Sequence, residues 1–242
     1  MRPILVGAHR GAMCYEPENT VAAFETAIQM GTYRIEFDVR RTADGHLVLM
    51  HDATVDRTTG GSGPVAEMTL VQARELKAGG KEPVPTLAEA LRCMKGRCKA
   101  LVEIKPPGIA DAVVRVIREE GMVADSTISA FDEATLLRVK ELEPELATAY
   151  FQIHPQPFHA REVIERLGVS LLIGWRRAID AAMLAEARAA GLHVRCGFGD
   201  SMSYEESYAL FRELVEMGAD EVSCGRPDWI SRMIREYTGA EP

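Results

Sequence analysis

The sequence has no long hydrophobic run. Nowhere does it approach the ~18 consecutive apolar residues that a membrane-spanning helix requires, and the apolar run at 4–8 is too short for the core of a signal peptide. We therefore expect no membrane insertion and a cytoplasmic location. A signal peptide removed from a longer precursor would leave the same N-terminus.

Cysteine is scarce and scattered. The pair Cys93 and Cys98 has no second pair that would complete a zinc site, and an odd number of cysteines argues against a disulfide scaffold. We expect a reducing compartment and interpret each cysteine as a small buried residue. The five cysteines stand at positions 14, 93, 98, 196 and 224.

Basic residues are outnumbered. Against 36 acidic side chains there are 28 lysines and arginines, so the formal net charge is −8. The resulting field repels nucleic acids and anionic membranes, and we expect no nucleic-acid partner. A content of 47% hydrophobic and 26% charged residues is typical of a folded globular chain. The length of 242 residues fits one α/β barrel of roughly 250 residues or two smaller domains.

Short apolar runs typical of buried strands alternate with segments of helical periodicity along almost the whole chain. Thr86 with Glu89 and Ser203 with Glu206 fit the capping box that begins a helix. The predicted strands span 4–8, 33–39, 47–50, 100–104, 126–130, 146–151, 169–173, 192–196 and 220–224. The predicted helices span 20–30, 87–94, 110–120, 133–142, 160–167, 180–190, 204–217 and 228–237.

A strand followed by a helix, repeated about eight times in a chain of this length, favours a closed parallel (β/α)8 TIM barrel over an open sheet. Residues 52–85 interrupt the alternation, since they are rich in glycine and proline. We interpret this segment as a loop or small subdomain inserted into the barrel, and residues 1–242 as a single domain.

Charged residues stand at the ends of several predicted strands. Period-two alternation places Glu36 and Asp38 on one face of strand 33–39, and Glu103 lies near the end of strand 100–104. Alone, strand 33–39 also fits a half-buried strand with its charged face in water. In a parallel barrel, however, the C-terminal ends of the strands form the face that holds active sites. The polar endings are His9-Arg10, Glu36 with Asp38, His51-Asp52, and Glu103 with Lys105.

These endings suggest phosphoryl chemistry at a metal. Three carboxylates without a thiolate, Glu36, Asp38 and Glu103, are typical ligands of a hard divalent cation, Mg²⁺ or Ca²⁺. Of His9 and His51, one can accept a proton from an attacking hydroxyl while the other donates one to the leaving oxygen. Arg10 offers a bidentate contact to phosphate and Lys105 a point charge. We expect only surface or packing roles for the remaining histidines, His46, His154, His159 and His193.

An ordered set of motifs in the first half resembles the glycerophosphodiester phosphodiesterase family. A looser match continues at 129–132 and 225–227. The motifs are His9-Arg10-Gly11, Pro17-Glu18-Asn19-Thr20, Glu36-Phe37-Asp38-Val39, the stretch from His51 to Gly60, Val84-Pro85-Thr86-Leu87, and Glu103-Ile104-Lys105.

The resemblance implies a TIM barrel with a small insertion after the second strand, which residues 52–85 supply. It also implies a divalent metal, Mg²⁺ or Ca²⁺, at the three acids named above, and His9 and His51 as the acid–base pair. Arg10 and Lys105 would contact the phosphate. Glu18 would support the metal or act as an acid at a helix start.

The implied reaction is the hydrolysis of glycerophosphodiesters to an alcohol and sn-glycerol 3-phosphate, within lipid or glycerol metabolism. In the mechanism proposed for the family, the glycerol 2-hydroxyl attacks phosphorus, and water then opens the cyclic phosphate.

The second half departs from the family. Trp-Thr-Val-Asn after the seventh strand and Thr-Asp-Arg-Pro after the eighth correspond here to 194–198 and 223–227, which lack the aromatic residue and the aspartate. Phe131, Phe198 and Trp175 are candidates to replace the aromatic surface, and Phe131 is our candidate substrate contact. Each of the three also fits ordinary packing.

Two other functions remain open. A lyase resembling sphingomyelinase D would use the same barrel and site but stop at a cyclic phosphate, although such enzymes are typically secreted and disulfide-bearing. A barrel that binds phosphodiesters without turnover would explain the altered second half, but it has no use for paired histidines. Head-group preference and oligomeric state are left undetermined.

Overall fold

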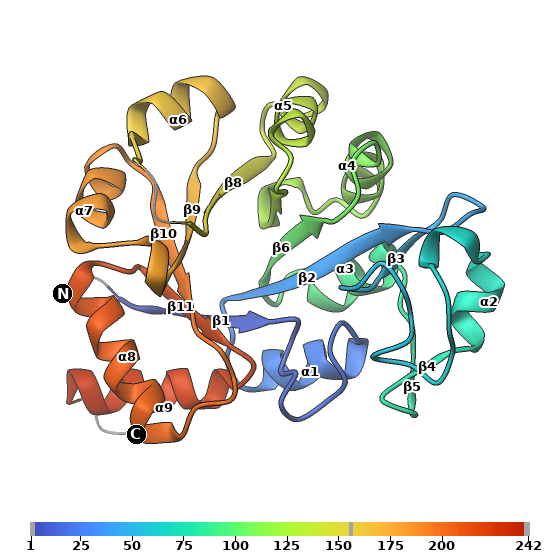
Figure 1. Ribbon diagram of the computed structural model, residues 1–242, viewed down its shortest axis with the longest axis horizontal. Helices are drawn as coiled ribbons and strands as arrows, with labels where there is room; N and C mark the ends of the chain where they lie inside the picture. Colours follow the sequence, from blue (N-terminus) through green and yellow to red (C-terminus); the bar gives the residue numbers. More distant parts are fainter. Residues whose placement is uncertain (1–2, 155–156, 240–242) are drawn as a thin grey trace.

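In the computed structural model, which describes residues 3–154 and 157–239, the chain forms a sheet of nine strands, of which all but β3 are parallel. The parallel strands close into a barrel because β1 pairs with both β11 and β2 (Figure 1). The predicted TIM barrel is therefore confirmed. Its strands are β1 (Leu5–His9), β2 (Arg34–Arg41), β6 (Lys99–Ile104), β7 (Ser126–Ser129), β8 (Ala147–Gln152), β9 (Leu171–Trp175), β10 (His193–Gly197) and β11 (Glu221–Cys224).

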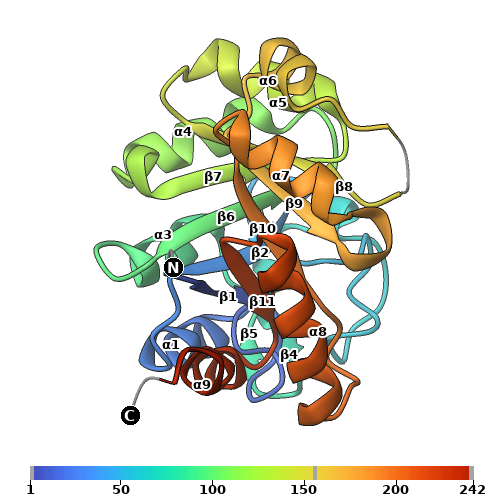
Figure 2. The same cartoon turned by 90° about the vertical axis from the view of Figure 1, so that its left-hand side faces the viewer.

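The helices pack outside the barrel (Figure 2), and each predicted helix is present with its ends within about one residue. Both predicted capping boxes, at Thr86 and Ser203, are formed. Among the described residues, no helix combines the length and apolarity that crossing a membrane requires. The helices are α1 (Val21–Gln29), α3 (Leu87–Met94), α4 (Ala110–Glu119), α5 (Glu133–Leu142), α6 (Ala160–Leu167), α7 (Ala181–Ala189), α8 (Tyr204–Met217) and α9 (Pro227–Thr238), with short 3-10 turns η2 (Val123–Asp125) and η3 (Arg176–Ala178).

The predicted strand 47–50 is not a barrel strand, and this corrects the sequence interpretation. It forms β3 (Leu47–Leu49), which runs antiparallel to the end of β2. A tight turn reverses the chain: Gly45 has a φ of 88°, which favours glycine, and the amide of Thr42 donates to the carbonyl of His46. The chain therefore returns toward the C-terminal end of the barrel.

The segment between β3 and α3 carries small elements of its own, at the right of Figure 1. It has a separate small core, made of Val48, Met50, Val55, Val65 and Val84. The elements are η1 (Val65–Glu67), α2 (Leu70–Glu75), β4 (Lys77–Ala78) and β5 (Glu82–Pro83).

The barrel interior is apolar on one side and charged on the other. Leu101, Ala149, Leu171 and Ile173, from β6, β8 and β9, form the apolar side. On the charged side, fully buried Glu221 of β11 pairs with Arg195 of β10 and lies 3.4 Å from Arg34 Nε of β2.

Gly7 of β1 leaves space for the Arg195–Glu221 pair, since a Cβ at this residue would lie 2.7 Å from Arg195 Nη1. Burial opposes ionisation of Glu221, but Arg195 and Arg34 outweigh burial and lower the pKa of Glu221 to about 2.

Candidate active site

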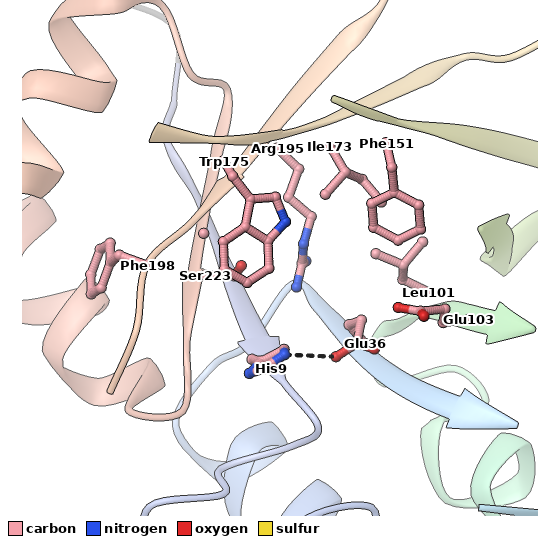
Figure 3. A pocket seen from close by; sticks show the side chains of 11 residues that line it. His9, Glu36, Leu101, Glu103, Phe151, Ile173, Trp175, Arg195, Phe198 and Ser223 are labelled. Atoms are coloured by element: carbon pink, nitrogen blue, oxygen red, sulfur yellow. Dashed lines mark ion pairs between the residues drawn. The ribbon is translucent and has the colours of Figure 1, made fainter. Parts of the chain in front are cut away.

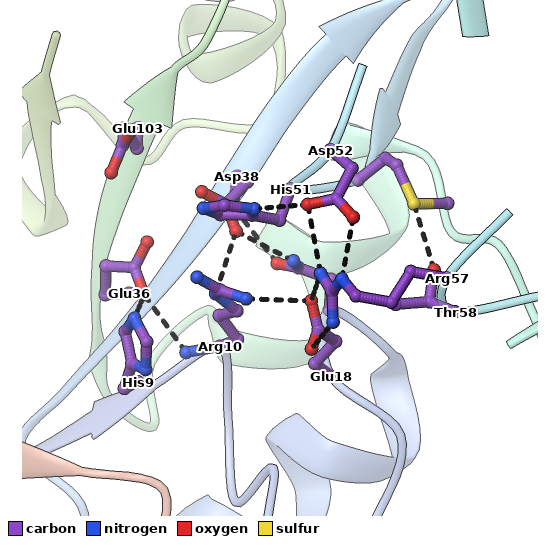
Figure 4. Close-up of polar contacts among 12 residues, drawn as sticks. His9, Arg10, Glu18, Glu36, Asp38, His51, Asp52, Arg57, Thr58 and Glu103 are labelled. Atoms are coloured by element: carbon purple, nitrogen blue, oxygen red, sulfur yellow. Dashed lines mark hydrogen bonds and ion pairs between the residues drawn. The ribbon is translucent and has the colours of Figure 1, made fainter. Parts of the chain in front are cut away.

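Three carboxylates converge at the C-terminal end of the barrel (Figure 4). Glu36 and Asp38 come from β2, and Glu103 from β6 is in register with Asp38. Each offers an oxygen that lies within 4.8 Å of the others, and all three residues are buried. Period-two alternation turns these side chains inward, while Ile35 and Phe37 pack into the core.

The three carboxylates fit a divalent cation. Burial, reinforced by the charges of Asp38 and Glu103, raises the pKa of Glu36 well above its usual value. Burial and Asp38 raise the pKa of Glu103 in the same way. A cation would remove this repulsion, and oxygen donors are the ligands that Mg²⁺ and Ca²⁺ prefer. Within the described ranges, no other cluster of histidine, cysteine, aspartate or glutamate has this geometry.

Two basic side chains flank the carboxylates. Lys105 Nζ lies 2.5 Å from Glu103 Oε1 and 3.3 Å from Asp38 Oδ1. Burial alone would lower the pKa of Lys105, but these two carboxylates raise it. Arg10 Nε lies 3.4 Å from Asp38 Oδ2. Arg10 follows β1 with a φ of 53°, and its backbone amide donates to Glu36 at 3.0 Å. The two predicted phosphate-binding residues therefore lie beside the predicted metal ligands.

The two predicted catalytic histidines lie on different elements of the chain. His9 ends β1, in register with Glu36, and its Nε2 lies 3.9 Å from Glu36 Oε2. Burial and Arg10 lower the pKa of His9 to about 4. His51 follows the antiparallel strand β3 by two residues, and its Nδ1 lies 2.6 Å from Asp52 Oδ1.

Arg57 links Asp52, the partner of His51, to Glu18, the partner of Arg10. The sequence did not indicate this role for Arg57. Its guanidinium donates to Asp52 at 2.6 Å and to both oxygens of Glu18 at 2.8 Å. Glu18 in turn accepts from Arg10 Nη1 at 2.9 Å. Hydrogen bonds to Arg57 and His51 hold the pKa of Asp52 well below its usual range. Arg57 belongs to the motif from His51 to Gly60, but the spacing of that motif does not identify the residues that Arg57 contacts.

One of the two roles expected for Glu18, that of an acid at a helix start, is wrong. Helix α1 has Thr20 as N-cap and no acid in its first turn, so Glu18 is not a helix-start acid. It lies outside the group of three carboxylates and is linked to Asp38 through Arg10. Asn19 is the second residue that sequence reasoning missed: its side chain donates to Asp38 Oδ2 at 2.8 Å and accepts from the Asp38 amide at 3.0 Å.

A pocket opens beside the carboxylate group (Figure 3). Trp175 and Phe198 line it, and Phe131 stacks on the lining residue Phe151 with ring centroids 4.5 Å apart. Arg195 also lines the pocket, which the sequence did not indicate. The lining residues are His9, Glu36, Leu101, Glu103, Phe151, Ile173, Trp175, Arg195, Gly197, Phe198 and Ser223.

An aspartate lies near the position where the family motif after the eighth strand has one. The Gly225 amide donates to Asp200 Oδ1 at 2.6 Å, and Arg226 donates to the Asp200 carbonyl. Asp200 follows β10 rather than β11, so the loops after these two strands are joined through it.

Known proteins of one family are similar to this chain. The profile of the glycerophosphoryl diester phosphodiesterase family matches residues 9–227. A glycerophosphodiester phosphodiesterase of Caldanaerobacter subterraneus is 41% identical over 155 residues, and one of Bacillus subtilis is 33% identical over 170 residues. These matches cover 59% and 60% of this chain but only 64% and 58% of the two relatives, which is less than two thirds of their length.

Solved structures match over nearly the whole chain. The glycerophosphodiester phosphodiesterase of Agrobacterium tumefaciens is 30% identical with a TM-score of 0.81, covering 96% of this chain and 100% of that one. An Oleispira antarctica phosphodiesterase in complex with the product sn-glycerol-3-phosphate is 28% identical with a TM-score of 0.85, covering 95% and 96%.

Proposed function

The chain belongs to the glycerophosphoryl diester phosphodiesterase family, and from this premise we propose that it hydrolyses glycerophosphodiesters to an alcohol and sn-glycerol 3-phosphate. The observation that carries the proposal is the group of three buried carboxylates with two histidines and two basic side chains at the mouth of the barrel. The Oleispira structure, which holds sn-glycerol-3-phosphate in a closely similar fold, supports it.

Glu36, Asp38 and Glu103 would hold a divalent cation, Mg²⁺ or Ca²⁺. Such a cation neutralises negative charge on a phosphodiester and on the carboxylates themselves. Lys105 and Arg10 lie against the same acids and would orient the phosphate through charge-assisted hydrogen bonds.

His9 and His51 would move the protons. Asp52 Oδ1 lies 2.6 Å from Nδ1 of His51 and would hold a proton on that nitrogen, which leaves Nε2 to exchange protons with the substrate. One imidazole accepts the proton of the glycerol 2-hydroxyl as this attacks phosphorus, and the other protonates the departing alkoxide. When water opens the cyclic phosphate, the two roles reverse.

A substrate screen with histidine variants tests the proposal. We expect turnover of glycerophosphocholine or a related diester with added Mg²⁺ or Ca²⁺, and its loss with EDTA. His9→Ala and His51→Ala should each lower kcat at least a hundredfold. His46→Ala is the matched control, because His46 is exposed in the β2–β3 turn. Full activity of either catalytic variant would contradict the assigned roles.

Phosphorus NMR of the product separates this reaction from the alternatives. Hydrolysis gives sn-glycerol 3-phosphate. A cyclic phosphate that persists would instead indicate a lyase, and calorimetric binding without any product would indicate a binding barrel.

We also propose a cytoplasmic location, a single domain, and a role in lipid or glycerol metabolism. The cysteines are all free thiols, which is compatible with a reducing compartment.

A further inference from the structure

Two of the few exposed large hydrophobic residues belong to or adjoin the pocket: Trp175 lines it, and Phe131 stacks on the lining residue Phe151. Phe131, two residues after the end of β7, is 59% exposed, and Trp175, at the end of β9, is 43% exposed. Phe151 of β8 lies between their strands, and its ring stacks on Phe131. We call Phe131, Phe151 and Trp175 the aromatic wall. The exposed large hydrophobics of the described ranges are Tyr15, Val71, Phe131, Leu137 and Trp175.

The aromatic wall continues inward as an apolar floor. Leu101 and Ile173 line the same pocket and belong to the apolar side of the barrel interior, against which Phe151 packs. Figure 3 shows Phe151 and Ile173 across the pocket from His9 and Glu36. An apolar surface therefore extends from the barrel interior to solvent, beside the groups that would bind the phosphate.

The wall offers no acid of its own to a cationic head group. Glu36 and Glu103 are the acids among the described lining residues, and both belong to the proposed metal site. Lys105 Nζ lies 6.0 Å from the centroid of the Phe131 ring, and buried Arg195 lines the pocket. Arg195 is paired with Glu221, so the basic group that acts at the wall is Lys105. With Glu36 and Glu103 bound to a divalent cation, the Lys105 ammonium disfavours another positive charge beside Phe131.

We propose that the enzyme prefers glycerophosphodiesters whose alcohol is uncharged and apolar, such as an alkyl group, over those whose alcohol carries an ammonium group. This inference rests on the proposed function. Because the phosphate would lie at Lys105, next to Phe131, the alcohol would extend along the aromatic wall. Water adds to phosphorus overall, the bond between phosphorus and the alcohol oxygen breaks, and the alcohol leaves with a proton.

Two sets of substrates test this preference in the wild-type protein. In a series of ethyl, butyl and hexyl esters of sn-glycerol 3-phosphate, kcat/KM should rise about two- to fourfold for each methylene that is buried. The second set pairs glycerophosphocholine with its 3,3-dimethylbutyl analogue, which has the same shape but no charge. We expect the uncharged analogue to be turned over at least tenfold more efficiently.

Variants then locate the effect. Phe131→Ser and Trp175→Ser should flatten the dependence on chain length. Leu137→Ser should preserve it. Leu137 on α5 is 42% exposed, close to the 43% of Trp175, but it does not line the pocket and, unlike Phe131, does not stack on a residue that does. Circular dichroism checks that each variant is folded. If a variant unfolds, the two substrate sets measured with the wild-type protein still test the preference for an uncharged, apolar alcohol.

The outcomes distinguish this inference from the function on which it rests. A flat alkyl series, or faster turnover of the choline ester than of its uncharged analogue, would overturn the preference and leave the hydrolase proposal intact. Failure to turn over any ester, including the ethyl ester, would overturn both.

Discussion

The buried charge pair in the barrel interior makes a quantitative prediction for stability. Replacing Glu221 by glutamine keeps the shape of the side chain but leaves Arg195, which is 3% exposed, without its countercharge. The pKa of Glu221 falls from 4.5 to about 2 in the folded protein. At 1.36 kcal/mol per pKa unit, ionised Glu221 contributes about 3 kcal/mol. We expect Glu221→Gln to lower the free energy of unfolding at pH 7 by about this amount.

Urea denaturation at several pH values measures the effect. With a slope of about 3 kcal/mol per molar urea, the midpoint should fall by about 1 M. Because the folded-state pKa of Glu221 is depressed, its contribution is complete above about pH 4.5 and is lost as the pH falls toward about 2. The wild type and Glu221→Gln should therefore converge in stability over that interval.

A double variant supplies the control. Arg195→Met combined with Glu221→Leu removes the charge pair, so that of the two buried arginines beside Glu221 only Arg34 is left without its carboxylate. We expect it to be more stable than Glu221→Gln alone. If Glu221→Gln lost less than about 1 kcal/mol, or lost the same amount at pH 2.5 as at pH 7, the electrostatic reasoning would be wrong.

Three further perturbations follow from the site and the barrel. Asp52→Asn should lower kcat about a hundredfold with little change in KM, because His51 loses the carboxylate that orients it; steady-state kinetics measures this, and an unchanged kcat would refute it. Mg²⁺ or Ca²⁺ at a hundred times its Kd should raise the free energy of unfolding by about 2.7 kcal/mol, as a shift in Tm, and the shift should shrink in Glu103→Gln. Gly7→Ala should cost about 2 kcal/mol or more, since its Cβ would lie 2.7 Å from side-chain atoms; Gly60→Ala, where a Cβ meets nothing within 4 Å, is the control in the same denaturation assay.

The sequence was sufficient for the architecture of the barrel. Strand and helix periodicities and the capping boxes at Thr86 and Ser203 depend on neighbours in the chain, so they are readable without the fold. The barrel strands were placed to within about two residues. The convergence of Glu36, Asp38 and Glu103 was also predictable, because the C-terminal ends of parallel strands meet at one face.

Strand 47–50 was misplaced because an apolar run shows that a strand is buried but not which way it runs. The direction depends on the turn at Gly45, where a positive φ folds β3 back along β2. The hairpin nevertheless returns His51 to the same end of the barrel as His9.

The sequence by itself determined the barrel and the gathering of Glu36, Asp38 and Glu103 at one end of it, because these follow from local periodicity and from one rule of parallel topology. Only the tertiary structure decided which charges meet: Arg57 with Glu18, 39 residues apart, and Arg195 with Glu221, 26 residues apart. Such pairs depend on the register of the strands and on the space left where Gly7 has no side chain. The spacing of residues along the chain shows neither the register between neighbouring strands nor the space beside Gly7.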